Sequence, residues 1–339
     1  MIQRLLLAAG ALLLLVVGVA WGVGVLGSDD EQRAGTVAPD APGTPGTSVA
    51  APASAGLDYV ALGDSFSSGP LIPLMRNDAS GCFRSTNNYP AYVADLLDVA
   101  SYRDVSCAGA VTSDLRRAQA VFLSDTRPPP QLDALSDDTD LVTIGIGGND
   151  YGLFGSIIGG CSRLATWSSP GSPCRDSFTA PDGTDTKARD ARRIRGQMTR
   201  ALAGVREAAP EADILVVGYP RLMPERGSCR AAGLTGKDAA WASRIAVLLN
   251  RSIERAADAN DATFVDLSHA SRGHDVCAGR EAWVNGRKDR PERALGFHPF
   301  QEGMAGVARV VAEAASGERP PRISGDAEPP EGSVVRGAP

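Results

Sequence analysis

The sequence is poor in histidine and lacks several motifs that would define its chemistry on their own. Only three histidines occur among 339 residues, so candidates for a general base are few. There is no C-x-x-C pair and no H-E-x-x-H segment, which argues against a zinc ribbon, a thioredoxin-like motif and a metal site of the H-E-x-x-H type. The net charge of −6 comes from interspersed acids and bases, and the absence of a basic stripe argues against nucleic acid as a partner.

The N-terminal region contains one long apolar run, residues 5–27, without a charged side chain. At about 1.5 Å per residue, this run can span a hydrocarbon core of about 30 Å. Arg4 precedes the run and Asp29 follows it, so the positive-inside tendency places the N-terminus in the cytoplasm. Gly18-Val19-Ala20 fits a signal-peptidase site, but the run exceeds a usual signal h-region. We favour a single-pass membrane anchor over a cleaved signal peptide, and both interpretations export the remainder.

The cysteines agree with export from the cytosol. An even number of cysteines outside the cytosol predicts disulfides. The sequence leaves their pairing open, and we expect neighbour to pair with neighbour. The expected bridges are Cys82–Cys107, Cys161–Cys174 and Cys229–Cys277.

Two polar segments flank a single expected domain. Residues 28–56 and 317–339 are rich in Pro, Gly, Ala and Ser, and such segments bury too little apolar surface to offset their ordering entropy. We interpret the first as a flexible linker and the second as a disordered tail. The intervening residues, 57–316, are enough for one sizeable core.

Short apolar runs alternate with amphipathic segments in this domain. Buried parallel strands have such short, β-branched, continuously apolar sequences, and strands that alternate with helices predict an α/β fold with a mainly parallel sheet between helical layers. The expected strands are 58–63, 102–106, 140–146, 213–218 and 263–267. The expected helices are 89–98, 186–209, 237–259 and 300–315.

Ser65 and Gly109 each follow an expected strand. Ligands of parallel sheets bind beyond the carboxyl ends of the strands. Ser65 can therefore expose its hydroxyl at the sheet edge, beside free backbone N–H groups that could hold an oxyanion. Capping of a helix is the alternative role for Ser65, and a simple turn is the alternative for Gly109. Asp64 is expected to shape the turn rather than to transfer protons.

Asn149 and His298 extend this pattern. Asn149 follows the third expected strand after two glycines, Gly147 and Gly148, and could donate an amide hydrogen bond into the same edge. An Asx turn is the alternative, while the G-x-G-x-x-G spacing of a dinucleotide loop is absent there. His298 precedes Pro299 at the start of the last expected helix. A neutral imidazole near Ser65 could take its proton during nucleophilic attack.

Together these motifs resemble the SGNH (GDSL) hydrolases. Ser65, Gly109, Asn149 and His298 occur in the order of that family, and the first block reads GDS. The resemblance implies a three-layer α/β/α sandwich and a serine carboxylic ester hydrolase. Ser65 would then be the nucleophile, His298 the general base, and Ser65, Gly109 and Asn149 the oxyanion-hole donors. It implies neither a metal nor a cofactor.

Within this family, the chain resembles the branch of secreted actinomycete lipases and esterases. Segments 273–277 and 283–286, with the six cysteines, carry that similarity. It implies an ester substrate, a lipid or another acyl ester. A carbohydrate O-deacetylase of the cell envelope and a non-catalytic surface binding domain are the alternatives.

One position departs from the family pattern. Family members often carry an aspartate three residues before the histidine, where this chain has Leu295. Some members of the resembling branch use a backbone carbonyl instead, so we expect the Leu295 carbonyl to orient His298. Asp266 and Asp275 are the rival orienting groups.

Two other interpretations are less favoured. His269 and His274 lack a metal-binding pattern, and we expect them to have loop or core roles. An ordinary α/β-hydrolase would need G-x-S-x-G at its nucleophile, whereas Ser67 stands two residues after Ser65.

Overall fold

The computed structural model describes residues 56–78, 81–121, 124–161, 163–164 and 166–318. The expected anchor and linker up to residue 55, and the tail from residue 319, lie outside these described residues. Within the described part, no helix is both long and apolar enough to cross a membrane.

A five-stranded parallel sheet forms the centre of the fold, in the order β2-β1-β3-β4-β5. Because β1 lies between β2 and β3, the loops that follow these three strands leave one edge of the sheet side by side. This order brings together the segment with Ser65 after β1, the segment with Cys107 and Gly109 after β2, and the segment with Asn149 after β3. The strands are β1 (Asp58–Gly63), β2 (Ser101–Asp104), β3 (Leu141–Gly145), β4 (Asp213–Val217) and β5 (Thr263–Val265).

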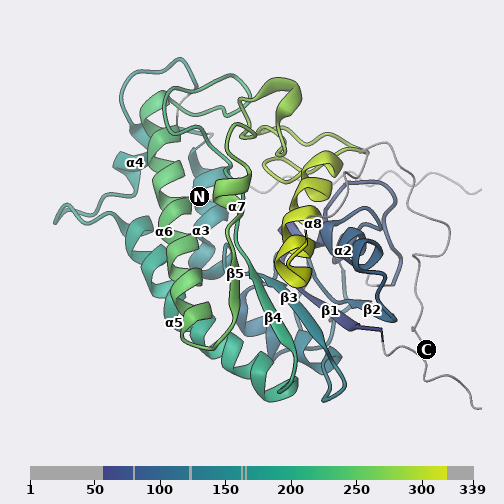
Figure 1. Ribbon diagram of the computed structural model, residues 1–339. Helices are drawn as coiled ribbons and strands as arrows, with labels where there is room; N and C mark the ends of the chain where they lie inside the picture. The colour runs from purple at the N-terminus through teal and green to yellow at the C-terminus, as the bar shows by residue number, and fades with distance from the viewer. Residues whose placement is uncertain (1–55, 79–80, 122–123, 162, 165, 319–339) are drawn as a thin grey trace, which may run out of the picture. The chain divides into compact units, whose positions relative to one another are not determined.

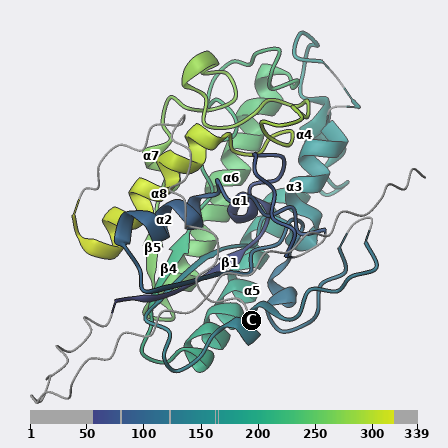
Figure 2. The ribbon, with the colours of Figure 1, turned by 90° about the vertical axis from the view of Figure 1, so that its right-hand side faces the viewer.

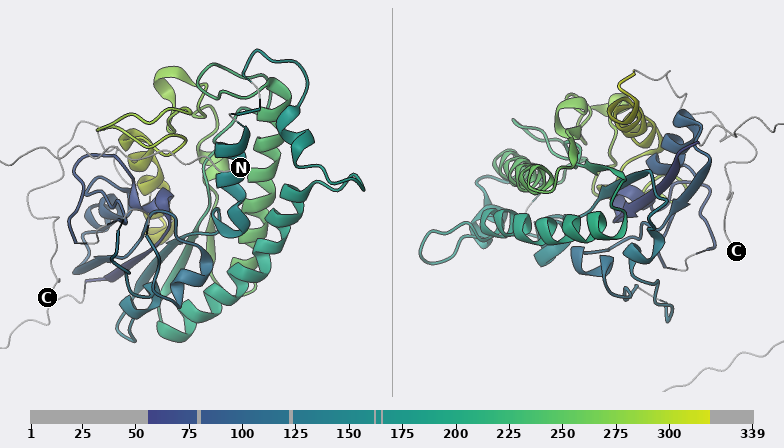
Figure 3. Two further views of the ribbon diagram at one scale, coloured as in Figure 1. Left: turned by 180° about the vertical axis from the view of Figure 1, so that it is seen from behind. Right: turned by 60° about the horizontal axis from the view of Figure 1, so that its bottom comes forward.

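Helices cover both faces of the sheet, as the two orientations in Figure 1 and Figure 3 show. Helices α5 (Thr186–Ala208) and α6 (Gly236–Asp258) pack together on one face. Helices α2 (Tyr89–Leu97) and α8 (Gln301–Ser316) pack together on the other, where Figure 2 shows them from the side. The chain therefore forms the expected three-layer α/β/α sandwich.

Alternate side chains of each strand supply two separate cores. Val60 and Leu62 point into the cluster shared with α5 and α6, while Tyr59 and Ala61 point into the cluster shared with α2 and α8. This double burial explains why the strands read as continuous apolar runs rather than as alternating patterns.

The long elements agree with the expected ranges to within two residues at each end. The short ones were not foreseen, because a helix of one turn has no measurable periodicity. These are α1 (Ser65–Ser68), α3 (Leu153–Gly155), α4 (Pro173–Ser177), α7 (Leu267–Ala270), the 3-10 helices η1 (Thr112–Leu115), η2 (Gln131–Ala134), η3 (Asp150–Gly152) and η5 (Gly279–Glu281), and the π-helix η4 (Ser156–Gly160).

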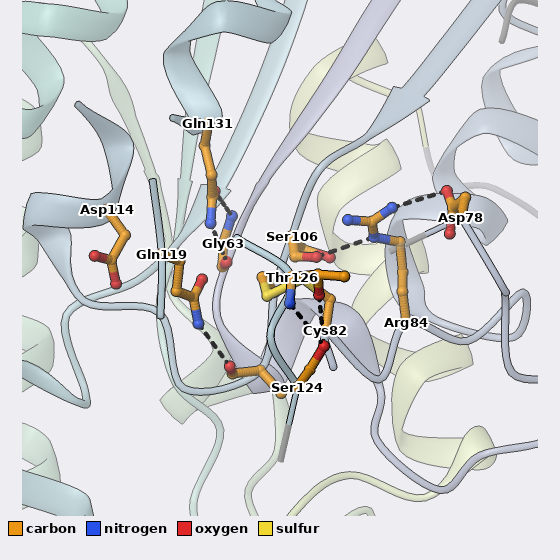
Figure 4. Close-up of a disulfide and its surroundings, with 12 residues drawn as sticks. Gly63, Asp78, Cys82, Arg84, Ser106, Asp114, Gln119, Ser124, Thr126 and Gln131 are labelled. Carbon is orange, nitrogen blue, oxygen red and sulfur yellow. Dashed lines mark hydrogen bonds and ion pairs between the residues drawn. A yellow bond between two sulfur atoms is a disulfide. The ribbon is translucent and has the colours of Figure 1, made fainter. Parts of the chain in front are cut away.

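The three disulfides form between neighbouring cysteines, as expected: Cys82–Cys107, Cys161–Cys174 and Cys229–Cys277. The first, drawn in Figure 4, fixes the loop after β2 to the loop after α1. Beside it, the buried Arg84 donates to the Ser106 carbonyl at 2.9 Å and to Asp78 at 2.9 Å. Together, these bonds hold the segment that leads to Gly109.

Removal of the Cys229–Cys277 bridge is expected to cost the most stability of the three. It closes a loop of 48 residues, against 25 and 13 for the others, and a longer loop loses more entropy when it is closed. On this scale the paired cysteine-to-alanine variants lose about 4 kcal/mol of unfolding free energy for Cys229–Cys277, about 3.5 kcal/mol for Cys82–Cys107 and about 3 kcal/mol for Cys161–Cys174. Denaturant unfolding of each variant measures the order, and a reversed order would contradict the loop-entropy explanation.

Candidate active site

Ser65 is the first residue of α1, immediately beyond the carboxyl end of β1. Asp64 caps this short helix by accepting a hydrogen bond from the Phe66 N–H at 2.9 Å, and the Gly69 N–H closes it by donating to the Ser65 carbonyl. Ser65 is 7% exposed. The four-residue helix thus places the hydroxyl at the sheet edge.

His298 contacts Ser65 directly, although 233 residues separate them in the sequence. The Nε2 atom of His298 lies 2.8 Å from the Ser65 hydroxyl oxygen. The imidazole also packs against the Phe66 ring, with 5.1 Å between ring centroids. This distance is within the range in which an imidazole accepts a hydroxyl proton.

The group that orients His298 is a backbone carbonyl, but it belongs to Gly296 and not to Leu295. The Nδ1 atom of His298 lies 2.7 Å from the Gly296 carbonyl oxygen. A carbonyl only accepts, so Nδ1 carries the proton and Nε2 is free to accept from Ser65. The expected Leu295 carbonyl is instead used by the His298 N–H and by the Asn285 side chain.

The turn at Phe297 explains why the Gly296 carbonyl, and not that of Leu295, contacts the His298 ring. Phe297, between the two residues concerned, has a φ of 60°, in the left-handed region. The backbone therefore reverses just before His298, and the carbonyl two residues back faces the ring. The rival carboxylates are engaged locally: Asp266 caps α7, and Asp275 accepts from the Cys277 N–H.

Gly109 and Asn149 lie on either side of the Ser65 turn. Gly109 has a φ of 79°, which favours glycine, in a turn closed by the Ala110 N–H donating to the Cys107 carbonyl. Asn149 follows β3 and donates from Nδ2 to the Ala110 carbonyl at 3.0 Å. An amide nitrogen carries two protons, so one remains for a ligand. Within the described residues, the N–H groups of Ser65 and Gly109 have no hydrogen-bond partner.

A second contact joins the same two loops. Thr112 donates its hydroxyl to Asp150 at 2.5 Å and its N–H to the same carboxylate at 3.0 Å. Burial raises the pKa of the Asp150 carboxyl, while the bonds from Thr112 lower it. This pair fixes the turn that carries Gly109 against the turn that carries Asn149.

Tyr219 links the turn that contains Asp64 and Ser65 to the loop after β3. Its hydroxyl donates to Asp64 at 2.5 Å and accepts from the Gly148 N–H at 2.7 Å. Burial raises the pKa of Asp64 to about 7, although the hydrogen bonds from Tyr219 and Phe66 lower it. No sequence pattern indicates this connection, because Tyr219 follows β4 and lies 155 residues from Asp64.

Gln131 is another residue that sequence reasoning missed. Its side-chain amide forms two hydrogen bonds with the backbone of Gly63, at 2.8 and 2.9 Å, at the end of β1. Figure 4 shows this pair near the Cys82–Cys107 bridge. A glutamine at the start of a one-turn 3-10 helix carries no recognisable signal in the sequence.

The other two histidines have structural contacts away from Ser65. His274 stacks on Trp283 with 4.7 Å between ring centroids, and His269 lies 3.3 Å from the Arg272 guanidinium. Among the described residues, no cluster of three or more His, Cys, Asp or Glu side chains could hold a metal ion.

Comparison with known proteins supports the resemblance seen in the sequence. Residues 61–305 match the model of the GDSL-like lipase/acylhydrolase family. Lipase 2 of Streptomyces coelicolor is 40% identical over 248 residues, which cover 71% of this chain and 81% of that protein. The chain belongs to the GDSL-like lipase/acylhydrolase family. Carboxylic ester hydrolysis is therefore its reaction class.

Two solved structures of Streptomyces proteins share the fold over about three quarters of this chain. The crystal structure of the extracellular lipase from Streptomyces rimosus is 29% identical, with a TM-score of 0.63 over 76% of this chain and 99% of that one. Phospholipase A1 from Streptomyces albidoflavus NA297 is 30% identical, with a TM-score of 0.62 over 77% and 99%.

In this family member, Tyr219→Phe is expected to lower kcat by more than its loss of unfolding free energy explains. The change leaves the buried Asp64 and the Gly148 N–H without their shared partner, at a cost of about 1–3 kcal/mol. We expect kcat to fall while KM stays nearly constant, because the two loops lose their common support. Tyr59→Phe is the matched control: it removes a buried hydroxyl bond to Thr143 with a similar effect on unfolding. Equal kcat for the two variants would refute the positioning role.

Proposed function

We propose that the chain is a serine ester hydrolase that acts through an acyl-enzyme formed on Ser65. The observation that carries this proposal is the 2.8 Å contact between His298 Nε2 and the Ser65 hydroxyl, with the Nδ1 proton held by the Gly296 carbonyl. A neutral imidazole in this tautomer is the form that can remove the serine proton.

The proposed reaction has two similar halves. His298 takes the Ser65 proton while the Ser65 oxygen bonds to the ester carbonyl carbon. The tetrahedral intermediate then expels the alcohol, which takes the proton from His298, and the acyl group stays on Ser65. Water repeats the sequence: His298 removes its proton, the acid leaves, and the proton returns to Ser65.

The oxyanion of each intermediate would be held by three donors. These are the N–H groups of Ser65 and Gly109 and the side-chain amide of Asn149. Two observations support this assignment: the three residues follow three neighbouring strands, and the two backbone N–H groups have no partner among the described residues. Loss of one such donor typically costs about 3–4 kcal/mol of transition-state stabilisation.

We propose that the substrate is a lipid or another ester with a long acyl chain. Among described residues, six of the seven exposed large hydrophobic side chains lie in the loops after β1 and β3, which also carry Ser65 and Asn149. Exposed apolar side chains on the loops that carry a site favour an apolar ligand over an acetylated sugar. They are Leu74, Met75, Phe83, Tyr151, Leu164 and Trp167.

We also propose that the domain spans residues 57–316 and works outside the cytoplasm. Its three disulfides support export, because such bonds persist in oxidising compartments. The Streptomyces rimosus relative is described as extracellular. Residues 5–27 would provide the membrane anchor or, if they are cleaved, the signal peptide. The N-terminal sequence of the protein recovered from its host distinguishes the two.

A panel of p-nitrophenyl esters of increasing acyl length, run beside acetylated glycans, tests the substrate proposal. We expect turnover to increase from acetyl to longer chains and to be low on the glycans. Preference for acetyl groups on the glycans would instead support the deacetylase alternative. Folded protein without activity on any ester would support the binding-domain alternative.

The pH profile should report the unusual pKa of His298. Burial lowers this pKa from 6.5 to about 4, while the Gly296 carbonyl and Asp289 act in the opposite direction. The base works when neutral, so we expect kcat/KM to rise as pH rises through about 4 and then to level off. Initial rates on a soluble ester measure this, with circular dichroism to confirm folding at each pH. A midpoint near 6.5, the ordinary histidine value, would contradict the assignment.

A further inference from the structure

A depression lined by basic side chains is formed by residues 285–290, in the loop that leads to His298, together with Arg230 and Ala231. Its volume is about 660 Å³, and four of its eight lining residues are positively charged. Only one lining residue is a carboxylate. The cations are Arg230, Arg287, Lys288 and Arg290, and the carboxylate is Asp289. This local excess is unexpected in a chain with a net charge of −6.

The charges in this depression are not neutralised by neighbours. Within the described part of the chain, none of its four cations forms an ion pair. The Asp289 carboxylate accepts a hydrogen bond from the Gly296 N–H at 2.9 Å. Arg290 packs over the Phe300 ring, 5.4 Å from its centroid. The four cations outnumber the one carboxylate of the hollow, so an anion bound there would lower the repulsion among them.

The backbone beneath these side chains is held in place. The side-chain amide nitrogen of Asn285, which is 1% exposed, lies 2.8–3.1 Å from the carbonyls of Lys288, Ala294 and Leu295 and shares its two protons among them. The Arg287 N–H donates to the Ala231 carbonyl, and the Arg290 N–H to the Ala294 carbonyl. The basic loop is thus organised before any ligand binds, which lowers the entropic cost of binding.

A second hollow of similar size provides a contrast. It measures about 580 Å³ and includes Arg175, Arg244 and Arg251, but also two carboxylates, Asp185 and Glu225. Apolar side chains of α6 form much of its wall. Its charges are more nearly balanced, so the same number of arginines there creates a weaker anion site.

We propose that the depression formed by Arg230, Arg287, Lys288 and Arg290 binds a phosphate group, as free phosphate or as a lipid headgroup. Guanidinium groups match the tetrahedral oxygens of phosphate with paired N–H donors, and three of the four cations are arginines. The site is separate from the Ser65–His298 pair but adjoins it, because the Asn285 N–H donates to the His298 carbonyl at 2.8 Å.

Two variants of equal charge test the proposal. Arg230→Gln/Arg287→Gln/Arg290→Gln removes three cations from the depression, and Arg175→Gln/Arg244→Gln/Arg251→Gln removes three from the second hollow. Calorimetric titration with inorganic phosphate measures binding, and flotation with phosphatidylglycerol or phosphatidylcholine vesicles separates a headgroup from free phosphate. Turnover of a soluble ester, which both variants should retain, confirms that each is folded.

We expect saturable phosphate binding that weakens at least tenfold in the first variant and stays within about twofold in the second. The lipid headgroup is identified as the source if the protein floats with phosphatidylglycerol vesicles but not with phosphatidylcholine vesicles, and if only the first variant loses this flotation. Phosphate binding without flotation identifies free phosphate. No phosphate binding by the unmodified protein, or equal weakening in both variants, would overturn the proposal. These readouts do not depend on the ester hydrolysis mechanism.

Discussion

Ser65→Ala is expected to abolish ester hydrolysis, with a loss of about 10⁶-fold in kcat. The variant removes the only hydroxyl within hydrogen-bond distance of His298 Nε2 in the described structure. The remaining donors can still bind an ester and stabilise charge, so slow hydrolysis by water is the residual reaction. Burst kinetics on a p-nitrophenyl ester, with active-site titration of the unmodified protein, measure the loss.

Ser68→Ala is the matched control for this variant. Ser68 belongs to the same four-residue helix, is fully buried, and has a hydroxyl without a partner in the described residues. Loss of that hydroxyl should change kcat less than about threefold. If Ser65→Ala kept a substantial fraction of activity while Ser68→Ala lost it, the nucleophile would be misassigned.

Asn149→Ala is expected to reduce kcat by about 10²–10³-fold with little change in KM. The side-chain amide would donate to the oxyanion, which exists only after the nucleophile attacks. Binding of the uncharged ester is therefore nearly unaffected, and the loss appears in turnover. Steady-state kinetics on one soluble ester separates the two constants.

Asn149 also donates to the Ala110 carbonyl. A control must therefore separate donation to the oxyanion from positioning of the two loops. Thr112→Val removes the hydroxyl bond to Asp150 and loosens the same pair of loops, but it leaves the Asn149 amide in place. We expect a loss of about tenfold or less in that variant. Equal losses in Asn149→Ala and Thr112→Val would show that loop positioning alone explains the effect.

The sequence was sufficient to predict the layers of the fold and the strand or helix end at which each of the four motif residues lies. Strands buried on both faces leave continuous apolar runs, and the helices α5 and α6 carry clear apolar stripes. Parallel strands place their carboxyl ends at one edge, so residues after β1, β2 and β3 had to lie near one another. The contact between Ser65 and His298 follows from that topology together with the packing of α8.

The sequence could not predict contacts that depend on the path of individual loops. The choice of the Gly296 carbonyl over that of Leu295 depends on the positive φ of Phe297, which no local pattern indicates. Tyr219 meets Asp64 only because β4 lies beside β3, which in turn lies beside β1. Such partners are fixed by tertiary packing rather than by spacing along the chain.

Covalent labelling by a fluorophosphonate, followed by peptide mass mapping, tests the central claim most directly. We expect one phosphonyl group per protein molecule, located on Ser65 and absent in Ser65→Ala. The labelling rate should fall sharply in His298→Ala, because the Ser65 hydroxyl then lacks its base. Label on another residue, or an unchanged rate in folded His298→Ala, would contradict the account of Ser65 and His298 as the reacting pair.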